Sequence, residues 1–131
     1  MINRQAVLDK FDGHCAYCGK EITLKEMQVD HFISKELGGT LRFENLFPAC
    51  RRCNFYKQYH LLHEFRELLI TLSDRLLDMF QVKIASDYGM VVITKWDGVF
   101  YFEKIQKKQL TKDEVLGMME EEMKIVKAGA K

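Results

Sequence analysis

The chain has 131 residues, of which 47% are hydrophobic and 30% are charged, a composition typical of one globular domain and not of a disordered segment. Its 20 basic and 19 acidic residues give a formal charge of +1, which excludes a strongly basic nucleic-acid coat protein but leaves room for a local basic surface. No apolar run approaches the ~18 residues of a membrane span, and charged residues interrupt the N-terminus where a secretory signal would be apolar, so we expect a cytoplasmic protein without a membrane partner.

The first 53 residues predict short elements arranged around two cysteine pairs. In chain order we expect a helix over 2–12, a cysteine knuckle over 13–20, a strand over 27–33, a turn over 36–40, a loop or second strand over 41–48 and a second knuckle over 50–53. Gly19 suits the tight turn of the first knuckle because glycine tolerates a positive φ.

The rest of the chain predicts a long helix, a β-hairpin and a terminal helix. Apolar residues at three- and four-residue steps indicate an amphipathic helix from Leu61 to Phe80, whose stripe is either core or a dimer contact. β-rich runs over 90–94 and 99–105, joined by an Asp-Gly turn, favour a hairpin, and a capping box at Thr111 begins the last helix. A soft boundary divides the chain into residues 1–83 and residues 84–131, the second unit being a specificity or dimerisation element.

The four cysteines are Cys15, Cys18, Cys50 and Cys53, and none is left over. Four thiolates are the ligand set of a closed, tetrahedral zinc site, which has no open position for chemistry and is therefore structural. The 31 residues between Cys18 and Cys50 exceed the usual gap of a simple zinc ribbon, so a folded insert is expected between the knuckles. A redox pair and disulfides are the alternatives, and a reducing cytoplasm disfavours the disulfides.

The insert and its flank contain the residue types that phosphodiester hydrolysis requires. A histidine near neutral pKa can deprotonate water, and His31 is such a residue. A Mg²⁺-type cation needs oxygen ligands, which the Asp30 carboxylate and the Asn54 amide can supply. Neighbouring strand residues point to opposite faces, so Asp30 and His31 share a site only if the strand twists or ends there.

The run V-D-H-F-I-S-K-E-L-G-G-T-L-R-F-E-N-L-F-P-A-C-R-R-C-N-F-Y-K, flanked by the cysteine pairs, resembles the core of HNH endonucleases of the four-cysteine zinc subclass. The resemblance covers about residues 13–58. It implies a ββα-metal module, and hence an α+β chain in which this zinc-stapled module precedes the long helix, the hairpin and the C-terminal helix.

The resemblance also implies a role for each matching residue. His31 is the general base, Asp30 and Asn54 hold a catalytic Mg²⁺ or Mn²⁺, and Asn45 braces the loop that orients the histidine, as in the H-N-N variant of the family. Ser34-Lys35 stands where a proline is frequent, and Gln58 stands where glycine is common. Both departures concern loop geometry and remove no reacting group.

Each of these residues has a plainer interpretation. His31 could be a hydrogen-bonded core histidine, Asn54 could cap the helix that begins near it, and Asp30 could pair with a lysine instead of a metal. His14 could join the zinc site, although four cysteines already fill it, and His60 and His63 are more simply surface residues than a second metal site.

A local basic group surrounds the last cysteine. The resemblance favours contact between DNA phosphates and Arg51, Arg52 and Lys57, whereas a solvated helix face is the plainer alternative. Phe55, Tyr56 and Tyr59 lie among these charges, and we expect core packing of these rings rather than stacking on bases.

These observations together predict a metal-dependent endonuclease that hydrolyses DNA. DNA is the expected partner, with a homodimer possible through the long helix or the C-terminal half. Two other functions stay open: a zinc domain that binds DNA without cutting it, and a subunit whose C-terminal half docks onto another protein.

Overall fold

The computed structural model describes residues 1–129, so residues 130–131 at the end of the predicted C-terminal unit lie outside the described part. The elements in chain order are α1 (Arg4–Asp9), β1 (Gln28–His31), the 3₁₀ turns η1 (Lys35–Leu37) and η2 (Phe43–Asn45), β2 (Leu46–Ala49), α2 (Arg51–Lys57), α3 (Leu62–Ile70), α4 (Leu72–Leu77), α5 (Phe80–Asp87), α6 (Tyr101–Gln106) and α7 (Lys112–Lys127). Small strands and separate helices confirm the predicted α+β class. Within the described chain no helix is long and apolar enough to cross a membrane.

The two strands form an antiparallel pair in which Asp30 lies opposite Phe47 and His31 lies opposite Leu46. β1 ends at His31, and α2 follows β2 after the single residue Cys50. The order β1, β2, α2 is the ββα arrangement that the sequence predicts. A two-stranded sheet is marginal alone, so its position depends on the packing and the cysteine cluster around it.

One hydrophobic core joins both halves of the sequence. Val7 of α1, Phe32 after β1 and Phe65 of α3 belong to the same buried cluster as Phe102 and Val115 near the C-terminus. The predicted units 1–83 and 84–131 therefore share a core, and the division at residue 84 stays a prediction.

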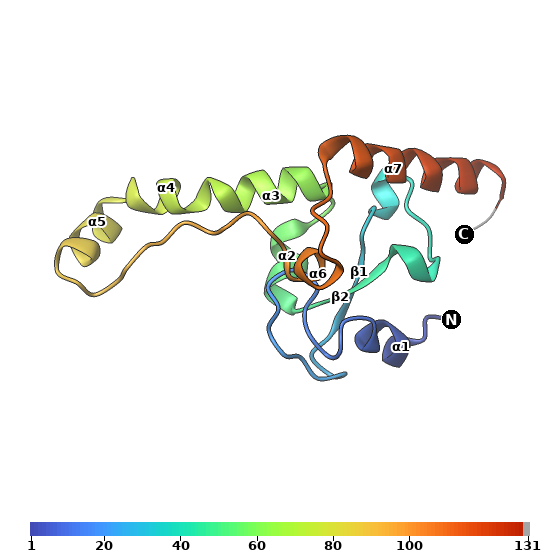
Figure 1. The fold of residues 1–131 in the computed structure, drawn as a ribbon, viewed down its shortest axis with the longest axis horizontal. Helices are drawn as coiled ribbons and strands as arrows, with labels where there is room; N and C mark the ends of the chain where they lie inside the picture. Colours follow the sequence, from blue (N-terminus) through green and yellow to red (C-terminus); the bar gives the residue numbers. More distant parts are fainter. Residues whose placement is uncertain (130–131) are drawn as a thin grey trace.

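The predicted long helix is present in segments. α3 and α4 run on as one rod with Thr71 between them, and α5 begins after Met79 takes an extended conformation (Figure 1). The hydroxyl of Thr71 donates to the carbonyl of Glu67 at 3.0 Å, a bond that competes with regular helix geometry. Leu62 and Phe65 of the stripe are core, whereas Phe80 at its end is 73% exposed.

The β-hairpin predicted over 90–105 is wrong. Residues 91–97 are extended without a strand partner, and residues 101–106 form α6 instead of a strand. The physical reason is tertiary: Glu103 is fully buried and accepts from the backbone N–H of Phe100 at 2.9 Å and from Arg66 at 2.7 Å. A carboxylate can reach the N–H three residues earlier only in a helical turn, which here also buries Phe100 and Phe102.

Candidate active site

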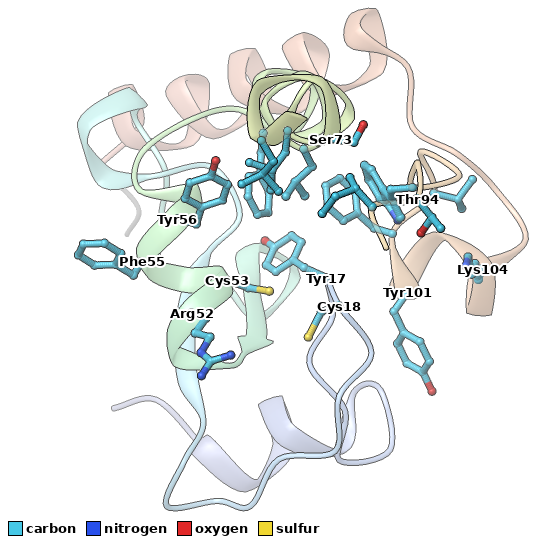
Figure 2. Close-up of a pocket in the computed structure, with 18 of the residues that line it drawn as sticks. Tyr17, Cys18, Arg52, Cys53, Phe55, Tyr56, Ser73, Thr94, Tyr101 and Lys104 are labelled. Atoms are coloured by element: carbon cyan, nitrogen blue, oxygen red, sulfur yellow. The ribbon is translucent and has the colours of Figure 1, made fainter. Parts of the chain in front are cut away.

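The two cysteine pairs converge on one point. The Sγ atoms of Cys15, Cys18, Cys50 and Cys53 all lie within 4.8 Å of one another, and those of Cys18 and Cys50 are 3.9 Å apart. Tetrahedral zinc with Zn–S bonds of about 2.3 Å separates its sulfur ligands by about 3.8 Å. Figure 2 shows the sulfur atoms of Cys18 and Cys53 close together. The four thiols therefore fit a structural zinc ion, as predicted.

A tight turn positions the first cysteine pair, and the start of α2 positions the second. Gly19 has a φ of 81° and donates to the carbonyl of Cys15 at 3.0 Å, which closes the first knuckle. Cys50 is the N-cap of α2, and its sulfur accepts from the backbone N–H of Cys53 at 3.4 Å. Hydrogen bonds from the Cys15 and Cys53 thiols lower the pKa of Cys18, and the contacts of Cys53 with Cys15 and Cys18 raise the pKa of Cys53.

A cleft of about 490 Å³ lies beside the strand pair, on the side of α2 that carries Asn54. Asp30 and His31 at the end of β1 line it together with Asn54. β1 ends at His31, which meets the condition under which two neighbouring residues can share a site. Three of the four predicted site residues thus surround one cavity.

Asp30 is a buried carboxylate with two partners. It is 4% exposed, Tyr17 donates its hydroxyl to Oδ2, and the Lys57 ammonium lies 3.2 Å from the same oxygen. Burial raises the pKa of Asp30, and the charge of Lys57 opposes that rise. Oδ1 has a single longer contact of 3.4 Å with Lys57. A carboxylate offers about four lone-pair sites, so Oδ1 keeps capacity for a further ligand such as a cation.

His31 presents a neutral ring to the same space. Its Nε2 atom is buried and has no hydrogen-bond partner within residues 1–129. Burial lowers the pKa of His31, the charges of Lys35 and Lys57 lower it further, and Asp30 acts in the opposite direction. A neutral imidazole near pH 7 has one nitrogen able to accept a proton.

Asn54 occupies the fourth position of α2, and its side chain makes no hydrogen bond to any described residue. The capping alternative for Asn54 is wrong because Cys50 is the N-cap. Its amide oxygen and the Asp30 carboxylate give the cleft two oxygen donors of the kind that Mg²⁺ and Mn²⁺ prefer. This donor set fits a hard cation that keeps several of its waters.

Asn45 is not among the residues that line the cleft, and it is 4% exposed. Its Oδ1 accepts from the backbone N–H of Ile33 at 2.8 Å, and its Nδ2 donates to the carbonyls of Ile33 and Thr40 at 3.0 and 2.9 Å. Three bonds tie the two ends of the loop after His31 to one side chain. The predicted role of Asn45, orienting His31 by bracing this loop, stays a prediction that these bonds favour.

Comparison with known proteins agrees with this geometry. A family model described as HNH endonuclease matches residues 15–70, which include both cysteine pairs, the cleft residues and α3. Residues 15–70, a little under half of the chain, are therefore similar to an HNH endonuclease domain, and we call this stretch the HNH domain.

Two curated proteins are similar over parts of this HNH domain. One is a CRISPR-associated endonuclease Cas9 of Corynebacterium diphtheriae, 44% identical over 41 residues, which are 30% of this chain and 4% of that protein. The other is the Septu protein PtuB of Bacillus thuringiensis, 36% identical over 59 residues, which are 42% of this chain and 23% of that protein. The chain therefore spans less than a quarter of the length of either relative.

The basic group of the HNH domain divides into surface and core. Arg51 and Arg52 are exposed on α2, as a phosphate contact requires. Lys57 is fully buried and donates to the carbonyl of Phe32 at 3.1 Å as well as to Asp30. The predicted phosphate contact of Lys57 is wrong for this reason.

The aromatic residues of α2 also differ from the prediction. Core packing holds for Tyr56, whose ring lies edge-on to Phe65 at 6.3 Å. Phe55 is 75% exposed and Tyr59 is 53% exposed, and Tyr59 lines the cleft. Two rings expected in the core are therefore exposed: Tyr59 at the cleft, and Phe55 at a separate groove.

Sequence reasoning missed the groups that hold Asp30 in place. Tyr17 lies inside the first cysteine pair, where no pattern shows that its hydroxyl reaches a strand thirteen residues later. The position of Lys57 near the site could have been predicted, because it lies three residues after Asn54 and hence on the same helix face. Glu122 of α7 accepts from the backbone N–H and hydroxyl of Thr40 at 2.9 and 2.7 Å. No sequence pattern indicates this contact.

Proposed function

We propose that the protein is a metal-dependent endonuclease that hydrolyses phosphodiester bonds of DNA, with His31 as the general base. The observation that carries the proposal is the shared cleft of Asp30, His31 and Asn54 inside an HNH domain. The reducing cytoplasm, where thiols stay available for zinc, is the compartment that we propose for it.

In this mechanism the neutral ring of His31 takes one proton from a water molecule. The water oxygen forms a bond to phosphorus in line with the bond from phosphorus to the 3′ oxygen, which breaks. The leaving 3′ oxygen takes a proton from solvent, so the products are a 5′-phosphate and a 3′-hydroxyl. General-base catalysis of this kind contributes about 10²- to 10⁴-fold to a rate.

Asp30 and Asn54 would hold the catalytic Mg²⁺ or Mn²⁺. Bound there, the ion would neutralise charge on the phosphate and on the leaving oxygen. Lys57 and Tyr17, which do not line the cleft, orient the Asp30 carboxylate, and Asn45 fixes the loop that follows His31. Arg51 and Arg52, exposed on α2, contact the phosphates of the bound strand.

A DNA-binding domain without cleavage is the second candidate. The observation in its favour is the ion pair of Asp30 with Lys57, because that lysine already neutralises the carboxylate proposed as metal ligand. The two functions differ in one product: the first predicts nicked DNA, and the second predicts bound but intact DNA.

The test uses supercoiled plasmid and zinc-loaded protein, with Mg²⁺ or Mn²⁺ added or omitted. Omission is preferable to chelation, because a chelator would also strip the cysteine site. We expect nicking only with the added metal, and at least a 100-fold loss in Asn54→Ala. Gln106→Ala, which removes an exposed amide on α6, is the matched control and should cut normally. Retarded but uncut plasmid under all conditions would favour the binding domain.

A further inference from the structure

Residues 72–96 form a projection that we name the arm. It consists of α4, α5 and an extended segment over residues 90–96 that returns toward the body (Figure 1). The body of the molecule covers little of the arm, and the HNH family match ends at residue 70, before the arm begins.

The arm concentrates exposed apolar side chains. Of the 18 large hydrophobic residues exposed in the described chain, eight lie in a stretch of 16 residues: Leu77, Met79, Phe80, Ile84, Tyr88, Met90, Val91 and Val92. Phe80 is 73% exposed and Val92 is 80% exposed. Single exposed apolar residues are ordinary, but a contiguous group marks an interaction surface.

An apolar groove of about 880 Å³ runs along the base of the arm. Leu72 and Leu76 of α4 line it together with Val92, Ile93 and Trp96 of the returning segment, and it extends to Cys18 and Cys53 of the cysteine cluster. Figure 2 shows Ser73 of α4 and Thr94 of the returning segment at this groove. Ser73 also lines the groove, and its hydroxyl is buried without a hydrogen-bond partner among the described residues. We call the exposed apolar residues from Leu77 to Val92 the apolar tip. The arm thus carries both this tip and the groove.

The returning segment has unused backbone groups. No backbone hydrogen bond within residues 1–129 involves Val91 to Trp96, although these residues are extended and β-branched residues dominate the first four. Unpaired N–H and C=O groups on an extended segment are a template for pairing with another strand.

The charges of the arm favour a second copy as its partner. The arm has three acidic and three basic residues, so it has no net charge and offers no attraction to nucleic acid. Asp74 of α4, Asp78 just after α4, and Lys83 and Asp87 of α5 are exposed, and no salt bridge of these residues is found within the described chain. Antiparallel packing of two arms places α5 of one copy beside α4 of the other, so that Lys83 of each copy can pair with Asp74 or Asp78 of the other.

We propose that two copies of this chain associate through their arms, packed antiparallel about a twofold axis. The apolar tip of each copy fills the groove of the other, and the returning segments meet along their unpaired edges. The same patch serves both copies, as an isologous twofold interface requires. The proposal goes beyond the nuclease function and does not depend on it.

The test is the molar mass of the full, zinc-loaded chain in solution, measured by light scattering or sedimentation over a series of concentrations. We expect twice the chain mass at micromolar concentration and above. Phe80→Asp and Val92→Asp should each weaken the dimer about 100-fold or more, because a charge placed in an apolar contact loses its hydration without gaining a partner.

Both substituted positions are exposed, so folding is preserved, and circular dichroism checks this in each variant. Val126→Asp, at an apolar position of α7 that is 46% exposed and outside the arm, is the matched control and should remain dimeric. A wild-type chain that stays monomeric throughout the series would overturn the proposal, as would a dimer that neither arm variant weakens.

Discussion

At the scale of single residues, the site depends on a buried carboxylate with competing partners. Asp30 lines the cleft, accepts from Tyr17 and pairs with Lys57, and both partners are buried. The D-H pair and the two asparagines were recognisable from the sequence, because their spacing resembles that of the HNH endonuclease motif. The residues that hold Asp30 in place were not recognisable, because Tyr17 and Lys57 reach Asp30 only in the folded chain.

Lys57→Met should destabilise the protein strongly. The substitution keeps most of the side-chain volume but leaves the Asp30 carboxylate buried without its countercharge, which costs about 3–5 kcal/mol of unfolding free energy. Denaturant unfolding of the zinc-loaded protein measures this loss. Lys25→Met, at an exposed lysine, is the control and should change stability by less than about 0.5 kcal/mol. Equal stability of the two variants would show that the Asp30–Lys57 pair does not support the fold.

At the scale of elements, α7 acts as a clamp on the loop after His31. Glu122 holds the backbone N–H and hydroxyl of Thr40, and the carbonyl of Thr40 accepts from Asn45. Gly38 allows the close approach, since a Cβ there would lie 2.7 Å from Met123 of α7. The capping box predicted α7 correctly, but a contact across 82 residues leaves no local pattern in the sequence.

Glu122→Ala should loosen this loop without unfolding α7. The amide of Thr40 loses its acceptor, and we expect its hydrogen exchange to accelerate at least about 10-fold through local opening. Glu121→Ala, at the exposed neighbouring position on the same helix, supplies the matched control. Unchanged exchange at Thr40 in Glu122→Ala would contradict the clamp.

The cysteine cluster should hold the ββα unit together. The strands have four residues each and α2 has seven, too few to persist without packing or a metal clip. Zinc chelation should therefore remove most of the circular dichroism signal and lower the melting temperature, and added zinc should restore both. An identical melting curve before and after chelation would exclude a zinc-dependent fold.

At the scale of the whole molecule, one core joins the HNH domain to the C-terminal helices while the arm stands apart. Sequence pattern predicted the class, the cysteine cluster and the cleft residues, because each has a local signature. It failed over residues 90–105, where β-branched and aromatic residues mimic a hairpin. There the buried pair of Arg66 and Glu103 and the burial of Phe100 and Phe102 decide the backbone.

The arm should govern the form of the cleaved DNA. One cleft cuts one strand, so a dimer supplies the two sites that a double-strand break requires. In Phe80→Asp we expect nicked plasmid to accumulate and linear plasmid to fall several-fold relative to total cleavage, as quantified on agarose gels. If wild type and variant gave the same ratio of linear to nicked product, double-strand cleavage would not depend on pairing of the arms.

The most direct test of the nuclease account compares His31→Ala with wild type on supercoiled plasmid, both zinc-loaded and supplied with Mg²⁺ or Mn²⁺. His60→Ala, outside the cleft, controls for loss of a histidine, and circular dichroism confirms that all three proteins are folded. The account predicts that wild type and His60→Ala nick the plasmid, and that His31→Ala is slower by about 10²-fold or more. Nicking by His31→Ala at the wild-type rate would contradict it.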